Sequence, residues 1–131
     1  MAATKHRGVL DTSVLTATDV QPLPGELAIS VISLAELHYG VLVATSAETR
    51  AVRLKRLTGL SKRFDPLPVD EAVVDSYGRL AAKVVDAGRR PRGRVMDLLI
   101  AATAHAHQAV LYTRNGEDLR DLEDLVDIVS V

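Results

Sequence analysis

Three carboxylates stand where they could act on one substrate. Asp11 directly follows the short apolar run of residues 7–10, and Glu36 and Asp97 each fall in the first turns of an expected helix. Carboxylates that are brought together raise each other's pKa, so a cluster of them is favourable mainly when a divalent cation compensates the charge. Ligand sets made only of oxygen favour Mg²⁺ or Mn²⁺ over softer metals. Such an ion supports hydrolysis of a phosphodiester, with water as the nucleophile.

Each carboxylate also has an ordinary structural explanation. Asp11 could cap the segment that follows it. Glu36 follows Ser33 by three residues, which is the spacing of a capping box at the start of a helix. Asp97 near a helix N-terminus is favoured by the helix dipole alone. Single residues therefore do not decide between chemistry and capping, and only their joint arrangement can.

An alternation of strands and helices must position these side chains. Apolar runs predict strands at residues 7–10, 27–30, 109–113 and 127–131, and at most a short or edge strand in 64–69, which holds two prolines. Apolar periodicity predicts helices over 33–44, 47–62, 70–88 and 95–107, and residues 117–125 form a short polar helix or a loop. In the third helix, capped by Asp70 and ended by Gly88, the expected inward face is Val73, Val74, Tyr77, Leu80, Ala81, Val84 and Val85. In the fourth helix it is Val95, Leu98, Leu99 and Ala102.

This order predicts an α/β fold, in which a central parallel sheet is flanked by helices on both faces. The 131 residues are enough for a single domain, which we expect to span 1–131. Because parallel strands end at the same edge of a sheet, Asp11, Glu36 and Asp97 can converge there. Asn115 and Asp118 follow the strand that ends at Thr113, so we expect them at the same edge.

The composition excludes several other classes of protein. The chain has no cysteine, which removes disulfides, thiolate metal sites and cysteine nucleophiles. With 16 basic and 17 acidic residues, contact with nucleic acid must rely on a local patch. Four aromatic residues are too few for a base-stacking platform. The longest apolar run, 98–102, is far too short for a membrane span or a signal peptide, so we expect a soluble cytoplasmic protein.

Four blocks along the chain resemble the signature motifs of VapC-type PIN-domain ribonucleases, the toxins of bacterial VapBC toxin-antitoxin pairs. The blocks occur in order and span nearly the whole chain. They are Val9-Leu-Asp11-Thr-Ser13, Ile32-Ser-Leu-Ala-Glu36-Leu-His-Tyr-Gly40, Asp97-Leu-Leu-Ile-Ala-Ala-Thr-Ala104 and Thr113-Arg-Asn115.

The resemblance implies a PIN-like fold and an endoribonuclease that uses Mg²⁺ or Mn²⁺. Asp11, Glu36 and Asp97 match the family's acidic positions around the metal, with Asp11 and Asp97 as the most direct ligands. The fourth acidic position is occupied here by Asn115, which puts a second metal in doubt. Asp118 either supplies the missing charge or caps the following short helix.

The resemblance also implies supporting groups and partners. Ser13 and Thr113 carry hydroxyls suited to holding the metal ligands, although Thr113 could equally be an ordinary strand residue. The expected partners are an RNA substrate, a VapB-like antitoxin that blocks the site, and a second copy of the chain in a homodimer. The helical pair from Ser33 to Lys62 could carry both protein contacts, although its apolar face fits core packing equally well.

Basic residues gather in two places where RNA phosphates could bind. Just before the helix of Asp97, a loop carries Arg89, Arg90, Arg92 and Arg94. This loop either holds phosphates beside the metal or is only solvated surface. For the basic face of residues 50–63, plain solvation is the favoured interpretation.

Two rival interpretations belong to other classes. A phosphorylated receiver domain is also a small α/β protein with acidic groups that bind magnesium. Asp70 could imitate its phosphoacceptor, but the late lysine that it needs is missing, because no lysine follows Lys83. The second rival is a catalytically inactive PIN-like binding module, which the substitution at Asn115 keeps open, and which the retained acidic residues oppose.

Overall fold

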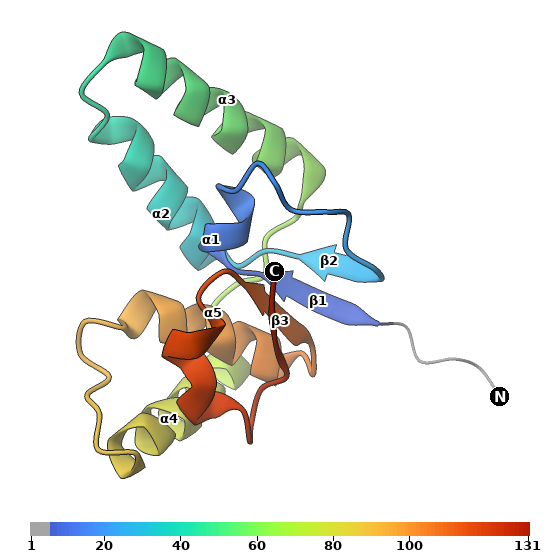
Figure 1. Cartoon of the computed structure of the whole chain (residues 1–131), viewed down its shortest axis with the longest axis vertical. Coiled ribbons are helices and arrows are strands. Elements are labelled where there is room, and N and C mark those ends of the chain that lie inside the picture. The colour runs from blue at the N-terminus through green and yellow to red at the C-terminus, as the bar shows by residue number, and fades with distance from the viewer. Residues whose placement is uncertain (1–5) are drawn as a thin grey trace, which may run out of the picture.

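A computed structural model describes residues 6–131, and its centre is a small parallel sheet (Figure 1). The strands are β1 (Arg7–Leu10), β2 (Glu26–Ala28), β3 (Val110–Thr113) and β4 (Ile128–Ser130). They lie in the order β2-β1-β3-β4, and every pairing is parallel. All strands therefore end at the same edge, as the sequence predicted.

Helices cover both faces of this sheet, which confirms the predicted α/β class (Figure 1). The helices are α1 (Thr12–Leu15), α2 (Val31–Leu42), α3 (Ala47–Arg63), α4 (Glu71–Asp86), α5 (Val95–Ala106) and the 3-10 helix η1 (Gly116–Leu122). Neighbouring residues of one strand point to opposite faces. Val9 and Leu111 are thus buried with α4, α5 and η1, whereas Leu10 and Tyr112 are buried on the side of α1 and α2.

Helix ends follow local chemistry where the sequence signals were strong. The Asp70 carboxylate accepts a hydrogen bond from the Val73 amide at 3.0 Å and caps α4. Gly88 has φ +80° directly after the end of this helix, as the stop signal predicted. Asp70 therefore has a capping role, and the receiver-domain interpretation loses its phosphoacceptor.

The start of α2 differs from the prediction. Ser30, not Ser33, is its N-cap and accepts from the Ile32 amide at 3.0 Å. Glu36 consequently lies in the second turn, too far along the helix for a capping box, so that explanation of Glu36 is wrong. The strand expected at 27–30 is also shifted, because β2 ends at Ala28 and Ser30 makes only an isolated bridge to Leu67.

Three side chains expected in the core are exposed instead. Val74 and Val85 of α4 are 58% and 57% exposed, and Val95 of α5 is 42% exposed. The buried face of α4 is narrower and includes the polar Ser76, whose hydroxyl lies 2.7 Å from Nδ1 of His105 on α5. Among residues 6–131, no helix is long and apolar enough to cross a membrane.

Gly8 of β1 leaves space for the ring of Tyr112 on β3. A Cβ at Gly8 would lie 2.5 Å from Cε2 of Tyr112, so only glycine leaves room for this ring across β1. The Tyr112 hydroxyl lies 2.7 Å from Nε2 of His6. The Tyr112 carbonyl accepts from the Asp11 amide at 2.9 Å, which fixes the backbone of Asp11 at the end of β1.

Candidate active site

Asp11 is held by hydroxyl groups from two segments of the chain. Its side chain is buried, and its Oδ2 accepts from the Ser13 hydroxyl at 2.6 Å and from the Thr113 hydroxyl at 3.0 Å. The Ser13 amide also donates to Oδ2 at 3.4 Å, so the predicted capping role at α1 is present as well. Among the described residues no group donates to Oδ1, and this oxygen is available to a ligand.

The backbone after β3 orients these two hydroxyls in turn. The Arg114 amide donates to Oγ of Ser13 at 3.0 Å, and the Asn115 amide donates to Oγ1 of Thr113 at 3.0 Å. Each hydroxyl accepts a hydrogen bond from an amide and donates its single hydrogen to Asp11. The end of β3 and the turn after β1 therefore form one network, and Thr113, which is fully buried, is more than an ordinary strand residue.

Glu36 is fixed by Thr12, a residue that the sequence analysis did not single out. The Thr12 hydroxyl lies 2.7 Å from Oε1 of Glu36 and 2.8 Å from Oγ of Ser33. Burial of the half-buried carboxyl raises the pKa of Glu36, the hydrogen bond from Thr12 opposes this increase, and the charges of Asp97 and Asp11 add to it. The charges of both other predicted carboxylates therefore raise the pKa of Glu36.

Asp97 lies in the first turn of α5, where no side chain caps the helix. Much of its side chain is exposed, yet partial burial of its carboxyl raises its pKa, and the charge of Asp11 raises it further. Arg94 lowers this pKa, whereas Asp118 raises it. A hollow of about 400 Å³ is lined by both Glu36 and Asp97, together with Arg94.

These carboxylates fit a divalent cation in chemistry and in charge. Within residues 6–131, no three side chains of metal-binding types are gathered tightly enough to enclose an ion as they stand. The donor set is nevertheless all oxygen, and one oxygen of Asp11 accepts no hydrogen bond from the described residues. Burial raises the pKa of Glu36 and Asp97, and the neighbouring carboxylates add to both increases. A cation would relieve the repulsion between these carboxylates.

The residues expected after β3 are less closely involved. Asn115 and Asp118 are exposed, and the Asn115 side chain has no hydrogen bond within the described part of the chain. Asp118 lies inside η1, whose N-cap position is Asn115, so the prediction that Asp118 caps this helix is wrong. Its charge reaches Asp97, which agrees with the alternative that it adds to the acidic cluster.

The four arginines of the 89–94 loop divide into two kinds. Arg89 pairs with Asp121 at 3.0 Å, and Nη2 of Arg94 donates to the Asp118 carbonyl, so both tie the loop to η1. Nη1 of Arg94 is buried without a hydrogen-bond partner in the described residues. Arg90 and Arg92 are exposed, and neither has an ion pair within residues 6–131.

Sequence reasoning missed Thr12 and Arg114. Both stand inside the motifs that drew attention to Asp11 and Asn115, and this was the available signal. Besides its amide contact with Ser13, Arg114 pairs through its guanidinium with Asp19, at 2.5 and 3.3 Å. Pairings between segments about a hundred positions apart cannot be deduced from spacing.

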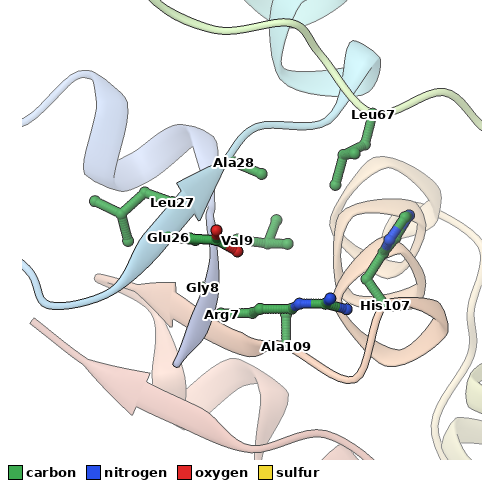
Figure 2. Close-up of a pocket in the computed structure, with 9 residues that line it drawn as sticks. All are labelled: Arg7, Gly8, Val9, Glu26, Leu27, Ala28, Leu67, His107 and Ala109. Carbon is green, nitrogen blue, oxygen red and sulfur yellow. The ribbon is translucent and has the colours of Figure 1, made fainter. Parts of the chain in front are cut away.

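A second hollow lies at the other end of the sheet. This pocket has a volume of about 520 Å³. Its lining combines Arg7, Glu26 and His107 with apolar side chains such as Leu67 (Figure 2). Arg7 begins β1 whereas Asp11 follows its end, so the pocket and the carboxylates lie at opposite ends of the strand. The pocket shares none of its lining residues with the acidic site.

Comparisons with known proteins agree with this geometry. The model of the PIN domain family matches residues 8–125. Ribonuclease VapC5 of Mycobacterium tuberculosis is 37% identical over 123 residues, which cover 89% of each chain, and Ribonuclease VapC8 of the same species is 42% identical over 101 residues, 74% of this chain and 89% of its own. VapBC-5 from M. tuberculosis, a solved member of the VapBC family of toxin-antitoxin systems, superposes with a TM-score of 0.85 at 37% identity and covers 95% of this chain and 98% of its own. VapBC-1 from nontypeable Haemophilus influenzae gives 0.75 at 25% identity, with 95% and 97% covered. The chain therefore belongs to the PIN-domain family and, within it, to the VapC ribonucleases.

Proposed function

We propose that this chain is the toxin of a VapBC-type pair and a metal-dependent endoribonuclease. The observation that carries the proposal is the state of Asp11, whose Oδ2 is held by two hydroxyls while Oδ1 stays free beside the charges of Glu36 and Asp97. The relatives named as VapC ribonucleases support RNA as the substrate. The proposed location is the cytoplasm, which agrees with cellular RNA as the proposed substrate.

Mg²⁺ or Mn²⁺ is the proposed cofactor, held by Asp11 and Asp97 with Glu36 assisting and Asp118 adding charge. When bound, such an ion lowers the pKa of a water and neutralises charge that develops on the phosphodiester. Ser13 and Thr113 keep the Asp11 carboxylate in one orientation through their hydrogen bonds to Oδ2. Asn115, with a neutral amide in the fourth position, contributes at most a carbonyl oxygen.

Glu36 is the proposed acceptor for the proton of the attacking water. Its Oε1 is occupied by the Thr12 hydroxyl, which leaves Oε2 for the water. Burial raises the pKa of Glu36, and a carboxylate with a raised pKa is a stronger base. Arg90 and Arg92, which have no ion pairs among the described residues, are the loop arginines best placed to contact RNA phosphates.

A VapB-like antitoxin and a second copy of the chain are the proposed protein partners. Solved relatives are VapBC complexes, which supports the antitoxin. The pair formed by α2 and α3 exposes several large apolar side chains, and contiguous exposed apolar surface marks protein contacts. They are Leu42, 79% exposed, Val43, 46%, Val52, 58%, and Leu54, 50%.

The inactive binding module is the weaker alternative. It rested on Asn115, which lies outside the hydrogen bonds that hold Asp11 except through its backbone amide. Asp11, Glu36 and Asp97 are all retained, and the similar proteins carry the name ribonuclease.

The test is cleavage of a mixed cellular RNA pool by purified protein with Mg²⁺ or Mn²⁺, repeated with a chelator and with Asp97→Asn. We expect discrete fragments that require the metal and vanish in the variant, and the fragment ends would identify the target. A folded protein that binds the metal and its antitoxin but cuts no RNA would instead establish the binding module.

A further inference from the structure

A hollow of about 350 Å³ is lined by residues of α1, α2 and α3 and includes Glu36 of the acidic site. Its lining includes Thr12, Glu36, Tyr39, Arg53 and Arg56. Glu36 also lines the hollow that contains Asp97, so both hollows border this residue. A polymer cut beside Glu36 and Asp97 would extend into the hollow lined by Arg53 and Arg56.

The charge of the hollow favours an anion. Arg56 is half-buried, and it forms no hydrogen bond or ion pair with any described residue. Arg53, one turn earlier on α3, is already committed, because its Nη1 donates to the Gly40 carbonyl at 2.7 Å. A half-buried guanidinium without a counter-ion is suited to bidentate binding of a phosphate.

The hollow also offers one aromatic surface. Tyr39 lies three residues after Glu36 on α2, and therefore on the same side of the helix. Its side chain is 68% exposed, whereas Tyr112 is 4% exposed and fills the core. Exposed aromatic rings beside a phosphate site are where unpaired bases stack in complexes with single-stranded RNA.

We infer that this hollow holds the nucleotide that adjoins the scissile phosphodiester, with Arg56 on its phosphate and Tyr39 against its base. This inference rests on the proposed ribonuclease function. Glu36, which lines both hollows, together with the free guanidinium, favours RNA over a protein segment as the occupant. The subsite would contribute to the choice of cleavage sequence as well as to affinity.

The experiment measures binding of a short fluorescein-labelled single-stranded RNA of random sequence by fluorescence anisotropy. It uses the Asp97→Asn background, so that the RNA stays intact. Arg56→Gln is compared with Lys55→Gln, which removes the same charge from an exposed position on α3 outside the hollow. We expect Arg56→Gln to weaken binding about tenfold and the control less than about twofold.

Salt dependence separates a phosphate contact from a general effect of charge. Loss of one contact lowers the slope of log Kd against log salt concentration by about 0.7 for single strands. Arg56→Gln should show this change, whereas Tyr39→Ala should weaken binding about fivefold or more without it. In the active protein, Tyr39→Ala should also broaden the set of fragment ends.

Equal losses in Arg56→Gln and Lys55→Gln, or an unchanged slope in Arg56→Gln, would overturn the subsite. If Arg56→Gln keeps its affinity for RNA but loses the antitoxin, the hollow is a docking site for protein. Failure of the parent chain to cleave RNA would count against the proposed function separately, because the binding measurement needs no cleavage.

Discussion

The residues around the site divide into those that could meet a substrate and those that hold them in place. Ser13 and Thr113 both donate to Oδ2 of Asp11, and no described residue donates to its Oδ1. Thr12 serves Glu36 in the same way. Such supporting contacts fix the orientation of a ligand or base, and their loss commonly costs about 10- to 100-fold in activity.

Replacing Thr12 by valine tests this division. Thr12→Val keeps the side-chain volume but removes the donor to Oε1 of Glu36, so we expect the cleavage rate to fall about 10- to 100-fold with the fold intact. Cleavage kinetics and thermal melts measure the two properties. Thr58→Val, at an exposed position on α3, is the control, and equal activities for the two variants would contradict the role of Thr12.

The charge of Asp97, a proposed metal ligand, affects the stability of the fold with a predictable sign. Burial and the charge of Asp11 raise its pKa above the usual 3.8, so without metal its ionised form destabilises the fold. Its contribution to stability is complete below pH 3.8 and is lost as the pH rises through the raised pKa. Asp97→Asn cannot ionise at this position and so does not lose this stability. We expect its melting temperature at neutral pH to exceed that of the parent chain by on the order of a few degrees.

Thermal melts in the presence of chelator, from neutral pH down to pH 3.8, provide the measurement. The difference between Asp97→Asn and the parent should shrink as the pH falls toward 3.8. Added Mg²⁺ or Mn²⁺ should stabilise the parent more than the variant, because an ion that binds only the folded state raises its stability. A variant that melts below the parent at neutral pH would show that the carboxylate is stabilised there after all.

Helices α4 and α5 end with the same backbone hydrogen bond, but different residues occupy the position that needs a positive φ. Arg89 and Ala109 each donate a backbone hydrogen bond across the end of the preceding helix, to Val84 and Ala104, at 3.0 and 2.9 Å. The residue before each donor must adopt positive φ. It is Gly88, at +80°, after α4, but after α5 it is Gln108, at +53°. A residue with a Cβ is strained there by about 1 kcal/mol.

Exchanging these two residue types should move stability in opposite directions. We expect Gln108→Gly to raise the free energy of unfolding by about 1 kcal/mol, and Gly88→Gln to lower it by about as much. No atom lies within 4 Å of a Cβ built on Gly88, so a steric clash does not confuse the comparison. Chemical denaturation measures both, and a less stable Gln108→Gly would mean that contacts of the glutamine side chain outweigh the strain.

The elements themselves were predictable where one signal dominated. The periodicity before Gly88 and the cap at Asp70 located α4, but the exposed Val74 and Val85 show that a wide apolar stripe does not reveal its buried centre. At α2 the capping-box spacing from Ser33 to Glu36 favoured Ser33 as the cap, whereas Ser30, three residues earlier, begins the helix. The four-residue α1 is too short for any periodicity.

The site was predictable as a set of carboxylates but not as a network. Parallel strands that end at one edge brought Asp11 and Asp97 into mutual influence, as expected. The contacts from Arg114 and Asn115 are made by backbone amides, which carry no signature in residue type. Nor could spacing show that Arg94 would bind the Asp118 carbonyl instead of remaining free for RNA.

At the scale of the whole molecule, the sheet separates two surfaces with exposed apolar side chains, and either could form a homodimer interface. On one side α2 and α3 expose Leu42 and Leu54. On the other side α4 exposes Val74 and Val85. A homodimer needs one self-complementary patch, and the larger exposed side chains of α2 and α3 favour that side.

Light scattering after size-exclusion chromatography distinguishes the two surfaces. We expect the parent chain to have twice the 14.1-kDa mass of one chain, Leu42→Glu to have the mass of a single chain, and Val74→Glu to remain dimeric. Both positions are exposed in the single chain, so the folds should survive, which thermal melts check.

Dissociation by Val74→Glu alone would move the interface to α4. A parent that stays monomeric at all concentrations would contradict the homodimer and leave the antitoxin as the proposed partner of α2 and α3.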